Sequence, residues 1–319
     1  MTIGSNLTTF AGLPVRRFEL DTGSRRRGAR REEPRRPMPG ERAAWRISVG
    51  YDAGEREVAD ALDALMDTVG AHHITALVIG SWGEPQASGP PLHLLTAARD
   101  RLTELRALFI GEMTYEECEI SWINQGEYAP LLGAFPALEV LHIRGADGLR
   151  LSPVRHRRLR ELCVESGGLP ASFIRGFTDS SFPALTDLEL WLGTQEYGGD
   201  AVVDDLAPIM TGTELPALKR LALRNAEIAD DVATALAAAP VVARLESLDL
   251  SMGALSDAGA EALLLGQPLT HLRSLDLSHH FMSKEMAARF VEELPGVRVD
   301  VSDEQDADED GFRYVSVAE

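Results

Sequence analysis

His142 and Cys163 are the residues of this chain whose types and spacing could support nucleophilic catalysis. Each precedes the last apolar residue of an L-x-x-L-x-(I/V) motif, so on adjacent strands of one sheet the imidazole and the thiol would be neighbours. Cysteine hydrolases make their nucleophile from such a pair. Glu189 has the same place in the next motif, where it would raise the pKa of the thiol, and no acid is expected beside the imidazole. A cysteine-dependent hydrolase is therefore only an alternative, and we predict that the protein is not an enzyme.

Two groups of aspartates have the residue type that binds cations. Asp249, Asp276 and Asp300 occupy equivalent places in successive motifs, where three like charges would invite a cation or a basic partner. We favour the interpretation that these side chains are simply solvated, because Leu-Asp-Leu-Ser is a common sequence in this kind of repeat. The segment 306–311, DADEDG, begins like an EF-hand calcium loop, but Val317 stands where that loop needs a bidentate Glu. We predict no metal site and no cofactor.

The elements that would position these residues are read from a repeated pattern of leucines. Leu245, Leu248 and Leu250 recur 27 residues later as Leu272, Leu275 and Leu277, and each set is followed by Ser, a short loop and a helix-like segment. This is the pattern of a leucine-rich repeat. One strand plus its return helix cannot bury its own apolar side, so the turns must stack, with the leucines between the sheet and the helices.

The repeat resembles the ribonuclease-inhibitor type of leucine-rich repeat, which implies a curved α/β solenoid that binds proteins. Three further stretches resemble a bacterial, largely actinobacterial, leucine-rich-repeat family of unassigned function. They are IGSWGE at 79–84, an insertion before Ile143 with the sequence GEMTYEECEISWINQGEYAPLLGAFPAL, and LELWLGTQEYGGDAVVDDLAPIM at 188–210. Members of that family lie beside genes for radical-SAM and ATP-grasp enzymes, so the resemblance implies a scaffold or recognition role next to peptide-tailoring chemistry.

The last apolar residue of each motif marks one strand, and the markers predict about ten parallel strands. They are separated by 30, 31, 33, 21, 26, 33, 27, 27 and 24 residues, and they are Val49, Ile79, Ile110, Ile143, Val164, Leu190, Leu223, Leu250, Leu277 and Val301. The step of 21 leaves no room for a full helix. Helices are best indicated at 200–210, 230–239, 256–265 and 283–294, with Ser256 and Ser283 as N-caps. We predict a right-handed α/β horseshoe with strands on the concave face and helices and loops on the convex face.

Composition divides the chain into four parts. Residues 1–20 are predicted to cap the first turn, 21–44 form an Arg- and Pro-rich linker, 45–302 form the solenoid, and 303–319 form an acidic tail with a possible capping strand. The formal net charge is −19, and the segment 16–46 carries eleven Arg against five acids, which leaves about −25 for the rest. A body this acidic repels phosphate backbones, so we expect no nucleic acid on the repeats.

A cluster on the predicted concave face has the composition of a protein-binding site. Equivalent positions of successive strands form rows, and the row after the last leucine places Trp191 beside two arginines and a glutamate. Trp and Arg are the residues most enriched in interface hot spots. The alternative is that the insertion covers Trp191. The predicted partner-binding residues are Trp191, Arg144, Glu165, Glu189, Asp187, Arg220 and Arg224.

These observations predict a non-enzymatic module that binds a protein or peptide of unknown identity. An accessory or recognition factor for peptide-tailoring enzymes is an alternative. The chain has two cysteines, no signal-peptide layout and no apolar run of transmembrane length, so we expect a cytoplasmic protein without membrane contact. Nothing in the motifs indicates a small-molecule substrate.

Overall fold

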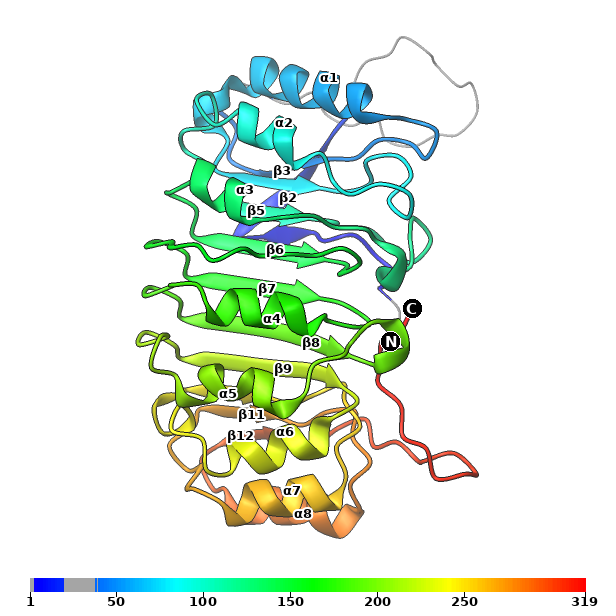
Figure 1. Cartoon of the computed structure of the whole chain (residues 1–319), viewed down its shortest axis with the longest axis vertical. Helices are drawn as coiled ribbons and strands as arrows, with labels where there is room; N and C mark the ends of the chain where they lie inside the picture. The colour runs from blue at the N-terminus through cyan, green and yellow to red at the C-terminus, as the bar shows by residue number, and fades with distance from the viewer. Residues whose placement is uncertain (1–2, 20–37, 39) are drawn as a thin grey trace.

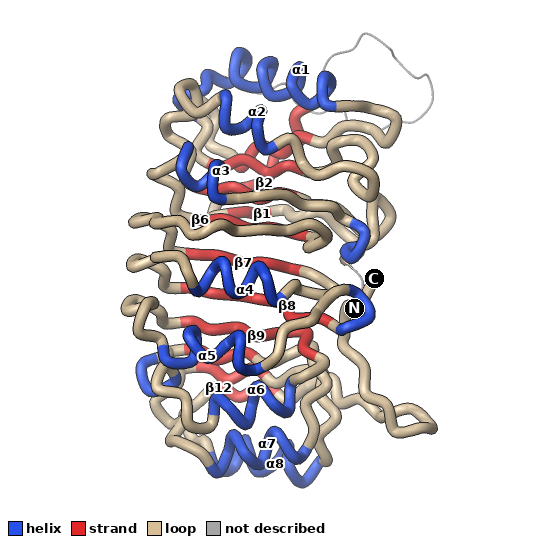
Figure 2. Tube along the Cα trace, viewed as in Figure 1, coloured by secondary structure: helices blue, strands red, loops and turns tan. Residues whose placement is uncertain are grey.

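A computed structural model describes residues 3–19, 38 and 40–319. Most of the predicted linker at 21–44 lies outside these residues. Within the described residues, twelve strands form one sheet in which each strand pairs with the next one along the chain (Figures 1 and 2). They are β1 (Thr9–Phe10), β2 (Leu13–Phe18), β3 (Ala44–Ile47), β4 (Ala76–Ile79), β5 (Ala107–Ile110), β6 (Val140–Arg144), β7 (Glu161–Glu165), β8 (Asp187–Gly193), β9 (Arg220–Ala226), β10 (Ser247–Asp249), β11 (Ser274–Asp276) and β12 (Arg298–Asp300).

All pairs are parallel except β1 with β2. A parallel sheet in strict chain order requires one return segment per strand, which is the arrangement of a solenoid. The strands β3 to β12 correspond to the predicted ones, and the hairpin of β1 and β2 extends the sheet beyond them.

The helices cover one face of the sheet (Figure 1). They are α1 (Glu55–Leu65), α2 (Leu92–Ala97), α3 (Ala129–Ala134), α4 (Ala171–Thr178), α5 (Val203–Thr211), α6 (Ala229–Leu236), α7 (Asp257–Leu265) and α8 (Lys284–Glu293). The fully described segment between β6 and β7 contains no helix, in agreement with its short length. The hydroxyls of Ser256 and Ser283 accept hydrogen bonds from Ala258 N and Met286 N, which confirms both predicted N-caps.

The leucines of the repeat form the core between the sheet and the helices. Leu188 pairs with Leu221, Leu221 with Leu248, and Leu248 with Leu275, and all four are buried. Burying one such side chain stabilises the fold by about 1.5–3 kcal/mol. The prediction that the leucine motifs face inward is confirmed.

The register of the first turn differs from the prediction. Ile47, rather than Val49, pairs with Ile79. Trp45, Ile47 and Val49 alternate with polar residues, and side chains on a strand repeat every two residues. A shift by two keeps the same side chains facing the core, so the sequence pattern could not distinguish the two registers.

The C-terminal residues do not form the capping strand considered from the sequence. After β12 the chain turns back along the ends of the strands toward the middle of the sheet (Figure 1). Phe312 and Tyr314 are exposed, whereas Val315 is buried. Among the described residues, no helix is long and apolar enough to cross a membrane.

The segment between β6 and β7, which has no helix, lies close to α4. This close approach predicts that alanine in place of Gly176 destabilises the protein. A Cβ at Gly176 would overlap the carbonyl oxygen of Leu151, because the extended segment passes close to this helix. In an open helix, Gly to Ala stabilises by about 1 kcal/mol. We expect Gly176→Ala to destabilise the protein by about 1–3 kcal/mol in urea unfolding.

The matched control is Gly133→Ala in α3, where a Cβ would meet no atom within 4 Å. We expect this variant to be stabilised by about 0.5–1 kcal/mol. Stabilisation of both variants by the same amount would contradict the close approach at Gly176.

Candidate functional site

The predicted partner-binding residues come together on the face of the sheet opposite the helices, which we call the open face. Arg144 pairs with Glu165, Asp187 with Arg220, and Trp191 with Arg224. Glu189 lies between the last two pairs on β8. The rows inferred from the repeat are therefore the rows of β6 to β9.

Trp191 is not the exposed anchor that the sequence suggested. Only 7% of its surface is exposed, because Ile120 of the insertion and Val317 of the tail pack on it. Its indole N–H donates to Glu189 Oε1 at 2.7 Å, and the Arg224 guanidinium lies 5.5 Å from the ring centre. The alternative reading is therefore correct in that the chain's own segments cover the ring. Covering so large an apolar surface stabilises the fold.

The charged residues around Trp191 are paired with one another. Arg144 contacts Glu165 at 2.5 Å, Arg224 contacts Glu189 at 2.9 Å, and Arg220 pairs with Asp187. Arg144 also donates to the Met113 carbonyl at 2.6 Å, so it holds the insertion. The side chain of Arg220 remains 59% exposed and is the most accessible of the predicted set.

The N-terminal segment covers the first part of the open face. Phe10 packs against Phe109 and His142, with ring centres 5.8 and 5.3 Å apart. Phe10 and Phe109, together with Val78 and three alanines, form a second apolar cluster outside the main core. The sequence contained a signal for this cover, because Val78 and Phe109 are adjacent apolar residues in one row of the open face, and an apolar patch there requires a cover.

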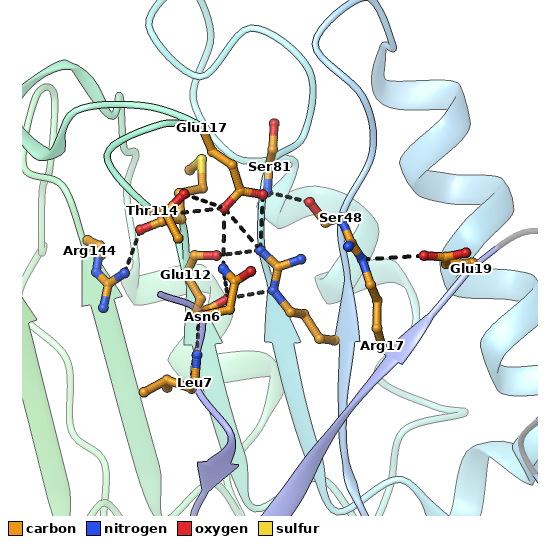
Figure 3. A network of polar contacts seen from close by, with 12 residues as sticks. Asn6, Leu7, Arg17, Glu19, Ser48, Ser81, Glu112, Thr114, Glu117 and Arg144 are labelled. Atoms are coloured by element: carbon orange, nitrogen blue, oxygen red, sulfur yellow. Dashed lines mark hydrogen bonds and ion pairs between the residues drawn. The ribbon is translucent and has the colours of Figure 1, made fainter. Parts of the chain in front are cut away.

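A buried ion network anchors this segment (Figure 3). The carboxylate of Glu112, fully buried after β5, accepts from Leu7 N at 2.7 Å and from Arg46 Nε at 2.5 Å. Asn6 donates to Glu112 and Glu117, and Glu117 also accepts from Thr114 N. Sequence reasoning did not identify these residues. A signal that could have found them is Arg46, a charged residue that lies beside the apolar Val78 and Phe109 in the observed register.

The C-terminal tail covers the middle of the open face. Asn225 binds the backbone of Val317 twice: its Oδ1 accepts from Val317 N at 2.9 Å, and its Nδ2 donates to Val317 O. Ser121 Oγ donates to Ala318 O, and Ser316 N donates to Met252 O. Asn225 is fully buried at φ 52°, a conformation that Asn tolerates better than most residues. These contacts fix an extended segment mainly through its backbone.

The burial and the surrounding charges of Cys163 do not favour a nucleophile at the His142–Cys163 pair. The two residues are neighbours, as predicted. Cys163 is only 4% exposed, and its thiol pKa is raised well above the ordinary value by burial and by the charges of Glu189, Glu165 and Glu161. The expectation that no acid contacts His142 is wrong, because its Nε2 lies 2.6 Å from Glu161 Oε1. The contact with Glu161 was not predicted, because Glu161 lies in the row next to the one that contains His142 and Cys163.

The repeated aspartates have a local structural role. Asp249, Asp276 and Asp300 pair in register, and each carboxylate accepts from the backbone N–H two residues later, at Ser251, Ser278 and Ser302. These are Asx turns, which end the strands. Asp308 makes the same bond to Asp310 N. Among the described residues, no group of three or more His, Cys, Asp or Glu side chains could hold a metal ion.

Several solved structures match the chain, and three of them are compared with it below. A Bacteroides fragilis protein solved by structural genomics is 27% identical, has a TM-score of 0.75, and is matched over 84% of this chain and 76% of its own length. An internalin from Listeria monocytogenes is 13% identical with 82% and 87% covered, and TLR13 in complex with ssRNA13 is 15% identical with 76% and 38% covered. Their TM-scores of 0.27 and 0.30 are too low to indicate a common overall shape. No family model and no curated protein sequence matches the chain.

The pair of hydrogen bonds between the Asn225 side chain and the Val317 backbone predicts how removing the side-chain amide changes stability. Asn225→Gly keeps the positive φ accessible but removes both hydrogen bonds, so we expect a loss of about 1–3 kcal/mol of stability. The Val317 amide should exchange with solvent at least about tenfold faster in NMR hydrogen exchange. Ser121→Ala, which removes one bond to the neighbouring Ala318, is the milder comparison. Unchanged protection of Val317 in Asn225→Gly would contradict this account of the tail.

The raised thiol pKa values predict slow alkylation. A raised pKa lowers the thiolate fraction at neutral pH, and the thiolate is the reactive form. The pKa of Cys118 is raised to about 11, chiefly by burial and then by Glu119, and Cys163 is more deeply buried. We expect iodoacetamide at pH 7.5 to label Cys163 more slowly than Cys118, and both more slowly than free cysteine. Labelling of Cys163 at the rate of a free thiol would favour the hydrolase alternative.

Proposed function

We propose that this protein is a non-enzymatic module that binds a polypeptide on the open face of its sheet. The observation that carries the proposal is that this face already holds two extended segments of its own chain. Glu112 accepts from the backbone at Leu7, and Asn225 both donates to and accepts from the backbone at Val317. Each segment also places an apolar side chain, Phe10 or Val317, on the sheet. A partner would use the same means of recognition.

The part of the open face that neither segment covers supplies the partner surface. In the first row, Glu161, Asp187 and Arg220 follow one another on β7, β8 and β9, and Arg220 is the most exposed of them. The next row carries Glu189, then Ala222 and Asp249. Acids outnumber bases among these residues, so a partner with basic side chains opposite the acids and a carboxylate opposite Arg220 is electrostatically complementary.

The rigidity of the open face also supports the proposal. The charged side chains are fixed by ion pairs on a sheet whose opposite side is packed against the helices. A receptor surface that is ordered before binding loses less entropy on association. The proposal includes the cytoplasmic location that the sequence predicted.

A photo-crosslinking amino acid at Ala222 tests the proposal, with the same group at the exposed Val291 of α8 as control. In an extract of the source organism, we expect one discrete polypeptide to crosslink at 222 and not at 291. Unlabelled protein should compete with this product. Identical products at both positions would overturn the proposal.

Arg220→Ala provides the matching affinity measurement, with Arg298→Ala of β12 as control in the same row. Loss of a central arginine in an interface costs at least about 1 kcal/mol, or roughly fivefold in affinity. We expect the crosslinked product at 222 to fall by this factor in Arg220→Ala only. The melting temperature should change little, because the pair with Asp187 is exposed.

A further inference from the structure

A pocket lies where the loops that follow four successive strands meet, on the edge of the solenoid that carries both chain ends in Figure 1. Its volume is about 250 Å³. The insertion after β5 supplies Ser121 and Trp122, the loop after β6 supplies 146–148, the loop after β7 supplies Gly168 and Pro170, and the loop after β8 supplies 196–198. Four turns of the repeat therefore contribute to one concave site that is separate from the open face.

Trp122 forms one wall of this pocket and is held in a fixed position. It ends a short 3-10 helix, Ile120–Trp122. Ile120 is buried against Trp191 and Val317, and Ser121 donates to Ala318 O, so the two residues before Trp122 are both fixed to the body of the protein. The Trp122 side chain is left 56% exposed, whereas the other three tryptophans are at most 7% exposed.

Tyr197 forms a second aromatic wall. It ends the 3-10 helix Gln195–Tyr197, and its hydroxyl donates to Glu319 Oε1 at 2.6 Å. Position 168 requires glycine, because a Cβ there would overlap the carbonyl oxygen of Tyr197. Gly148 and Gly198 have positive φ and add no side chains to the lining.

The charge around the pocket is negative. Asp147 and Glu196 line it, Glu319 is bonded to Tyr197, and none of the lining residues, all within the described chain, is basic. The hydrogen bond to Glu319, with the charges of Glu196 and Glu119 as lesser causes, raises the pKa of Tyr197 to about 12. Aromatic faces combined with carboxylates attract cations, because the ring quadrupole and the negative charges act in the same direction.

We propose that this pocket binds the side chain of a lysine or arginine from a polypeptide partner. Trp122 and Tyr197 contact the aliphatic stem and the charged group, and Asp147 and Glu196 neutralise the charge. A polypeptide fits better than a free amine, because the same edge carries further exposed aromatic residues, Tyr51 and Tyr115, that extend the contact surface. Tyrosine and tryptophan are enriched in protein interfaces.

The test uses the full chain labelled with ¹⁵N and the blocked peptide acetyl-Gly-Lys-Gly-amide, with its arginine and norleucine analogues. The exposed indole of Trp122 should shift saturably with the lysine and arginine peptides, while the three buried indoles stay unchanged. Norleucine has the same stem without charge, and we expect it to bind at least about threefold more weakly. Binding of the lysine peptide should also weaken as salt is raised, because exposed charges are screened.

Variants assign the effect to the proposed residues. We expect Trp122→Ala, followed through the Gly198 amide, and the double variant Asp147→Asn with Glu196→Gln each to weaken lysine-peptide binding at least about threefold. Phe312→Ala, an exposed aromatic outside the pocket lining, should bind as the natural chain does. Equal binding of lysine and norleucine, full binding by Trp122→Ala, or no saturable shift would overturn the proposal. These outcomes do not depend on the open face, whose test uses Ala222 and Arg220.

Discussion

Every feature of this protein depends on the inability of a single repeat to bury its own leucines. A short strand and its return segment leave one apolar side exposed until the next turn covers it. Stacking therefore forces strands into parallel register about 4.8 Å apart and brings equivalent residues into rows. The pairing of Leu188, Leu221, Leu248 and Leu275 shows this constraint directly. The contacts of Trp191 with Arg224 and of Asp187 with Arg220 are consequences of the same register.

The repeat period made most of the fold predictable. Rows on the open face, the N-caps Ser256 and Ser283, and the missing helix before Val164 all followed from spacing and residue type. The first register was wrong by two residues, because an alternating strand has the same pattern after such a shift. The sequence also placed Cys163 beside His142 but missed Glu161, since diagonal neighbours belong to a different row.

What covers the open face could not be predicted in the same way. Periodicity indicates which side chains point outward, but not which distant segment lies over them. Trp191 was correctly placed and wrongly expected to be exposed, because the residues that cover it are about 70 and 125 positions away in the chain. Asn225 was overlooked for a related reason, since its partner Val317 belongs to a segment without a repeat. The buried charges of Arg46 and Glu112 were similarly hidden by their separation in sequence.

The two chain ends alter the mechanical character of the solenoid. An ordinary repeat array has contacts only between nearest neighbours, so its terminal turns can fray independently. Here Ile3 and Val317 pack in one cluster with Trp191, close to the centre of the sheet, and Figure 1 shows both ends arriving there. Opening an outer turn therefore strains contacts made at the middle. We therefore expect the outer turns to unfold together with the middle of the array instead of fraying independently.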